Sequence, residues 1–254
     1  MKAPQYITYF APILIYAFTE LLIFYPKNYW VFWAAINLVV FYSVYRIAKK
    51  SGSAAGGWQN FAILPFCLIN SVIAYALVLA NPALIQGLIF LAIVIIYFYI
   101  NAIFFYHFFP ARYKSFQIES ISSYGNFLAV FFLSSALYGI QSFIGWPVWL
   151  VMIILTIFFL LVIYQVNWAN KAAISDSSVY IFVLTLILVE IAWTLSFLPL
   201  SYSILGMMLS AGYYVLIGIS KHHLQGTLEG KIIKTYLGVA AVCLVAILLS
   251  ARWI

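Results

Sequence analysis

Two glutamates lie inside long apolar runs, and their type and position make them the residues most suited to chemistry. Glu20 lies in the run 6–25, and Glu190 lies in the run 178–198. A carboxylate in the hydrocarbon of a bilayer costs roughly 3 kcal/mol on insertion scales, and such residues often mark solute or ion pathways. We therefore expect a functional role for Glu190 first. Glu20 comes second, because it lies nearer the end of its run.

Polar and aromatic groups accompany both glutamates. Tyr16 precedes Glu20 by one helical turn, and Trp193 and Thr194 follow Glu190. Residues three or four apart share a helix face, so each glutamate belongs to a partly polar face, and one compartment could hold both. The alternative is that each is a neutral carboxylic acid that bonds to a neighbouring helix and serves only packing.

Four asparagines extend the candidate polar interior, each in a different apolar run. Intramembrane amides join helices by hydrogen bonds more often than they contact a ligand. The candidate intramembrane site therefore consists of Glu190, Glu20, Asn70, Asn37, Asn101 and Asn126.

The remaining side chains argue against most membrane enzymes. The chain has five acidic residues, too few and too dispersed for the clustered carboxylates that hold Mg²⁺ on phosphorylated lipids. The zinc motif His-Glu-x-x-His and the nucleophile motif Gly-x-Ser-x-Gly are absent from the sequence. His222 and His223 are adjacent in an expected loop, where two ligands without a third are a weak metal signal. We expect no catalytic residue, no cofactor and no metal.

Composition places these residues in a membrane. Hydrophobic residues make up 67% of the 254-residue chain, charged residues make up 7%, and the mean hydropathy is +1.11. Lipid offers no hydrogen bonds to the backbone, so spanning segments are helices or closed barrels. The apolar runs are continuous and do not alternate with polar residues, which indicates helices.

The turn residues divide the chain into nine expected spans. We predict an all-α integral membrane protein, with residues 1–254 as a single transmembrane helical domain. Eight spans are the alternative, because the last run is short. The predicted spans are 6–25, 29–48, 58–80, 84–108, 121–143, 147–167, 178–198, 201–219 and 233–251.

The distribution of basic residues predicts the orientation. The formal net charge is +7, but the basic residues lie in short connections and form no single stripe, so we expect no nucleic-acid partner. Ten of the twelve fall on the side of the N-terminus, and Lys27 and Arg252 fall on the other. By the positive-inside rule the N-terminus is cytoplasmic and, with nine spans, the C-terminus lies outside the cell membrane.

Small residues predict which helices approach closely. They mark the fifth, eighth and ninth spans as the bundle centre, whereas the sixth span lacks such a stripe and should face lipid. The residues concerned are Ser135, Gly139, Gly206, Ser210, Gly218, Gly238 and Ala241.

Three functions are compatible with this pattern. The first is a small transporter or permease-like protein that moves a small or amphipathic solute past Glu190 and Glu20. The second is a non-catalytic membrane partner or scaffold subunit. The third is a membrane-embedded transferase acting on a lipid, which the small number of acids and histidines disfavours. A hydrated cavity around the glutamates would favour the first.

Overall fold

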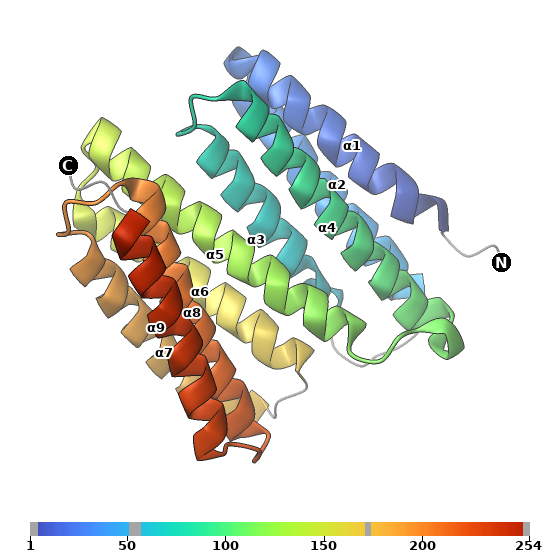
Figure 1. The fold of residues 1–254 in the computed structure, drawn as a ribbon. Coiled ribbons are helices and arrows are strands. Elements are labelled where there is room, and N and C mark those ends of the chain that lie inside the picture. The colour runs from blue at the N-terminus through green and yellow to red at the C-terminus, as the bar shows by residue number, and fades with distance from the viewer. Residues whose placement is uncertain (1–4, 51–56, 171–173, 251–254) are drawn as a thin grey trace. The chain divides into compact units, whose positions relative to one another are not determined.

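A computed structural model describes residues 5–50, 57–170 and 174–250 (Figure 1). Throughout these ranges the regular structure is helical, and no strand occurs. The long helices are α1 (Gln5–Phe24), α2 (Tyr29–Lys50), α3 (Trp58–Ala76), α4 (Pro82–Phe108), α5 (Gln117–Ile144), α6 (Val148–Ala169), α7 (Ile174–Leu195), α8 (Tyr202–Leu224) and α9 (Gly230–Ser250).

Nine helices in the described part of the chain are long and apolar enough to cross a membrane. The predicted all-helical membrane class is therefore confirmed, and so is the count of nine. The last run, which the sequence leaves least secure, forms a helix of 21 residues. At 1.5 Å per residue this helix reaches about 30 Å, the thickness of a hydrocarbon core.

Two compact units divide the chain, residues 1–125 and residues 126–254. The division falls within α5. Whether the units form the single transmembrane domain predicted from the sequence stays a prediction.

In the first unit, α1 packs against α2 and α4, and α3 packs against α2 and α4 (Figure 1). Fully buried branched side chains fill the spaces between these helices: Ile15, Ile36, Val40, Leu68, Ile96 and Ile100. Asn81 fixes the start of α4, because its side-chain oxygen accepts the amides of Ala83 at 2.9 Å and Leu84 at 3.4 Å. Pro82 occupies the first helical turn, where its missing N–H costs nothing.

In the second unit, α6 packs on α7, α7 on α8 and α8 on α9. The C-terminal part of α5 joins them through the hydroxyl of Tyr138, which donates to the carbonyl of Ala192 at 2.9 Å. Gly206 of α8 lies directly against α5: a Cβ there would come within 2.9 Å of the Ser135 backbone nitrogen. The predicted close contact between the fifth and eighth spans is therefore confirmed.

Two packing predictions are wrong. The ninth span is not central, because only 6% of its most apolar segment is buried, and a Cβ added at Gly238 would meet no described atom of another helix within 4 Å. The sixth span does not simply face lipid, because Leu155, Phe159 and Val162 of α6 are almost fully buried. Large apolar side chains can pack a helix closely without small residues, and the absence of a small-residue stripe did not reveal this.

Candidate functional site

Glu20 and Gln86 form a polar pair between α1 and α4 of the first unit. The Gln86 side-chain amide donates to Glu20 Oε2 at 3.0 Å. Glu20 is half-buried one turn before the end of α1, and Gln86 lies one turn inside the capped start of α4. The Asn81 cap fixes where α4 begins, and it therefore fixes the position of Gln86 along the helix relative to Glu20.

The second carboxyl oxygen of Glu20, Oε1, is buried and is not hydrogen-bonded to any residue that the structure describes. Tyr16 lies one turn earlier on α1, on the same helix face as Glu20. A buried oxygen without a partner is unfavourable by about 1–3 kcal/mol, so this position suits a ligand or a water molecule that donates a hydrogen bond.

An aromatic groove of about 560 Å³ begins beside this pair and lies between α1 and α4. Tyr16 and Phe90 are in its wall, one turn from Glu20 and Gln86 respectively. The rings of Tyr9 and Tyr97, whose centroids are 6.0 Å apart, lie further along it. The wall consists of Tyr9, Pro12, Ile13, Tyr16, Phe90, Ile93, Val94 and Tyr97. The carboxyl group therefore stands near one end of a long, mainly apolar surface.

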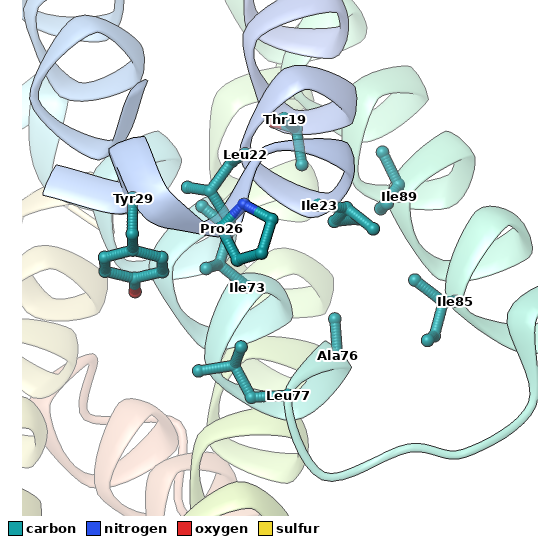
Figure 2. A pocket seen from close by; sticks show the side chains of 10 residues that line it. All are labelled: Thr19, Leu22, Ile23, Pro26, Tyr29, Ile73, Ala76, Leu77, Ile85 and Ile89. Atoms are coloured by element: carbon teal, nitrogen blue, oxygen red, sulfur yellow. The ribbon is translucent and has the colours of Figure 1, made fainter. Parts of the chain in front are cut away.

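A smaller pocket of about 130 Å³ lies between the ends of α1, α3 and α4 (Figure 2). Thr19 and Tyr29 are its only polar side chains, and the Thr19 hydroxyl already donates to the carbonyl of Ile15 at 2.7 Å. Ile23, Ile85 and Ile89 supply apolar wall, as Figure 2 shows. Glu20 and Gln86 are not in the lining, so this pocket offers room for apolar groups and little to bind a polar one.

Asn37 and Asn70 join α2 to α3. Asn70 donates to Asn37 Oδ1 at 2.9 Å and to the carbonyl of Phe66 at 2.7 Å, and its oxygen accepts the indole N–H of Trp33 at 2.7 Å. Asn37 in turn donates to the carbonyl of Trp33 at 2.9 Å. Both side-chain oxygens and both side-chain nitrogens take part, so this network needs no ligand. It acts as the interhelical contact expected of intramembrane amides.

The other two asparagines lie elsewhere. Asn126 of α5 is fully buried and donates to the side-chain oxygen of Gln165 on α6. Asn101 of α4 is half-buried, and its side chain makes no hydrogen bond within the described ranges. The structure thus brings Asn37 and Asn70 together, and it does not bring Asn101 to them or to Glu20.

Glu190 has quite different surroundings. It is exposed on α7, as are Trp193 and Thr194, and it makes no hydrogen bond or ion pair with any residue that the structure describes. Glu20 belongs to the first unit and Glu190 to the second. A common compartment for the two glutamates, and a functional role for either, stay predictions.

The histidine pair belongs to the last turn of α8, not to a loop as expected from the sequence. His222 Nδ1 lies 3.0 Å from the Thr227 hydroxyl, and His223 Nε2 lies 2.9 Å from the Tyr180 hydroxyl. In the described ranges, no three His, Cys, Asp or Glu side chains come together as metal ligands would.

Gln86, Trp33 and Gln165 are the partners that the sequence analysis missed. Gln86 had a usable signal: it follows Asn81-Pro82 by four to five residues, while Glu20 precedes Pro26 by six. Both therefore lie near the ends of their spans on one side of the membrane, within reach if the two helices are neighbours. Nothing in the sequence shows that α1 and α4 are neighbours.

Comparison with known proteins identifies a family but no characterised relative. No curated protein and no solved structure matches the chain. One family model, described as "Protein of unknown function (DUF5656)", matches residues 31–250. The match covers most of the sequence and eight of the nine candidate spans. The protein is therefore a multi-pass helical membrane protein that belongs to the family DUF5656.

Proposed function

We propose that the protein is a transporter-like membrane protein that binds an amphipathic, positively charged solute between α1 and α4. One observation carries the proposal: Glu20 has a buried carboxyl oxygen that finds no partner among the residues the structure describes, next to an aromatic groove. A carboxylate attracts a cation, and tyrosine rings add cation–π attraction of about 0.5–2 kcal/mol. The groove would hold the apolar part of the same molecule.

The aromatic cation ethidium is a suitable probe for this site, because it combines a positive charge and apolar rings with amino groups that can donate a hydrogen bond to Glu20 Oε1. We expect purified protein to bind it, and Glu20→Gln to weaken the binding about tenfold or more, because the amide keeps the shape and removes the charge. Glu190→Gln is the matched control, since it removes the same charge from a second intramembrane position. Equal binding by wild type and Glu20→Gln would refute the proposal.

Transport itself needs a separate measurement. The probe should enter liposomes that contain the wild-type protein faster than it enters liposomes without protein. Liposomes that contain the Glu20→Gln variant should take it up no faster than those without protein. Binding without passage would leave the site in place and exclude transport of this probe class.

A second candidate is a non-catalytic partner or scaffold subunit. The exposed Glu190 on α7 favours it, because Glu190 has no polar partner within the described ranges, and a carboxylate in a span is stabilised when a second membrane protein supplies a polar group. Cross-linking from a cysteine placed at Trp193 in native membranes would test it: a specific cross-linked protein supports this role, and lipid adducts alone contradict it.

We also propose that the protein lies in the cell membrane with its N-terminus in the cytoplasm. The proposal rests on the asymmetry of basic residues, of which Lys2, Lys171 and Arg252 lie outside the described residues. In a background without Cys67 and Cys243, cysteines at Ser115 and Gln225 should react only from the cytoplasm, and cysteines at Asn28 and Gly145 only from outside. Reversed labelling would invert the orientation.

A further inference from the structure

A second groove in the first unit runs along α2 to the start of α3. Its volume is about 530 Å³, and it is a largely open surface groove. Trp33 and Asn37 lie at one end, and Tyr45 and Trp58 lie at the other. It shares no wall residue with the groove beside Glu20.

Aromatic contacts between α2 and α3 build this groove. Phe41 stacks on Phe66 with a centroid distance of 5.5 Å, and Trp58 meets Phe41 edge-on at 6.4 Å and Tyr45 edge-on at 5.4 Å. The hydrogen bond from Trp33 to Asn70 closes the far end. Rings held in this way offer a rigid apolar wall that loses little side-chain entropy when a ligand binds.

Two cations stand at the Tyr45 end. The Lys49 ammonium donates to the Tyr45 hydroxyl at 2.5 Å and lies 5.0 Å from the centroid of that ring. The Arg46 guanidinium lies 5.9 Å from the centroid of the Tyr42 ring. Both rings belong to the groove wall. Neither cation is paired with a carboxylate in the part of the chain that the structure describes, and both are exposed, so both are available to an anion.

The length of the groove matches one leaflet of a bilayer. Trp33 and Tyr45 are twelve residues apart on α2, which is about 18 Å along a helix. Half of a hydrocarbon core is about 15 Å thick. A single lipid could therefore lie with its tail against the rings and its headgroup beside Arg46 and Lys49.

We propose that this groove is a specific binding site for an anionic phospholipid. The phosphate contacts Arg46 and Lys49, and one acyl chain follows the aromatic wall toward Asn37. The site is independent of the transporter proposal, because it uses neither Glu20 nor Glu190.

The charge dependence of the site can be measured with phosphatidylglycerol. Native mass spectrometry of the purified protein should show retained phosphatidylglycerol in preference to phosphatidylcholine. Since each basic residue near a membrane surface contributes about fivefold to anionic lipid affinity, Arg46→Gln with Lys49→Gln should weaken retention at least about tenfold. The matched control is Arg112→Gln with Lys114→Gln, which removes two charges between α4 and α5.

The wall can be tested with phosphatidylglycerol that carries brominated acyl chains. Bromine should quench the fluorescence of Trp58, measured as the difference between wild type and Trp58→Phe, and the Arg46 and Lys49 double variant should relieve the quenching. Equal loss of lipid in the two charge variants would mean diffuse surface attraction and overturn the proposal. Equal retention of the two lipids by wild type would overturn it as well.

Discussion

Glu20 and Glu190 each lie about one turn before the end of their helices, α1 and α7, yet their surroundings differ. Glu20 accepts a hydrogen bond from the Gln86 amide of α4, and its other, buried oxygen has no partner in the described part of the chain. Glu190 is exposed and makes no polar contact with the described residues. The depth of an intramembrane acid thus follows from its position along a span. Its burial and its hydrogen bonds depend on which helix lies beside it.

The largest loss of stability should follow a substitution at the close contact between α5 and α8, in the unit that carries Glu190. Gly206→Leu forces α8 away from α5, because even a Cβ would contact the Ser135 backbone. We expect a loss of about 3 kcal/mol in the free energy of unfolding, or loss of folded protein. Gly238→Leu on α9 makes the same change in open surroundings and should be nearly silent. Similar thermal unfolding of the two variants would mean that the second unit is not packed as described, and the exposure of Glu190 would then be in doubt.

A smaller loss of stability is expected at the amide network between α2 and α3, whose polar groups are already hydrogen-bonded. Asn70→Leu removes the hydrogen bonds to Trp33 and Asn37, and we expect a loss of about 1–2 kcal/mol in the free energy of unfolding. Asn101→Leu is the control, since Asn101 has no such bonds within the described residues. If chemical denaturation finds equal losses, the amide network between α2 and α3 does not stabilise the unit.

The two glutamates themselves should respond with opposite signs. Glu20→Leu leaves the Gln86 amide without its acceptor and should destabilise the protein by about 1 kcal/mol. Glu190→Leu replaces an exposed intramembrane carboxylate by an apolar group and should stabilise it by about the same amount. Melting temperatures in detergent measure both. If Glu190→Leu destabilises the protein, Glu190 has a stabilising partner, and the difference between the two glutamates is disproved.

The smallest expected effect is the coupling between Glu20 and Gln86. In a double-mutant cycle with Glu20→Leu and Gln86→Leu, the double variant should be more stable than the sum of the single losses predicts, by about 0.6 kcal/mol. Additive losses would show that the 3.0 Å hydrogen bond contributes nothing.

The sequence predicts the spans well and the neighbours poorly. Apolar runs and turn residues locate the nine helices of the described ranges to within five residues at each end, because length and hydropathy are local properties. The pairing of Glu20 with Gln86 and the burial of α6 depend on which helices touch. In lipid, helices are apolar on all sides, so hydrophobic periodicity does not reveal the inner face. Gly206 and Gly218 did indicate contacts directly, since the lack of a side chain permits the close approach of Ser135 on α5 and of Tyr236 on α9.

The network of Trp33, Asn37 and Asn70 also fixes the axial register of α2 against α3. Sliding one helix by a turn, about 5.4 Å, would separate the two amides and carry Trp58 away from Phe41 and Tyr45. The aromatic groove exists only in the register that the amides select. A polar contact near the middle of these spans therefore sets the shape of the surface at their basic end, although Asn37 lies nine residues, or roughly 14 Å along the helix, before Arg46.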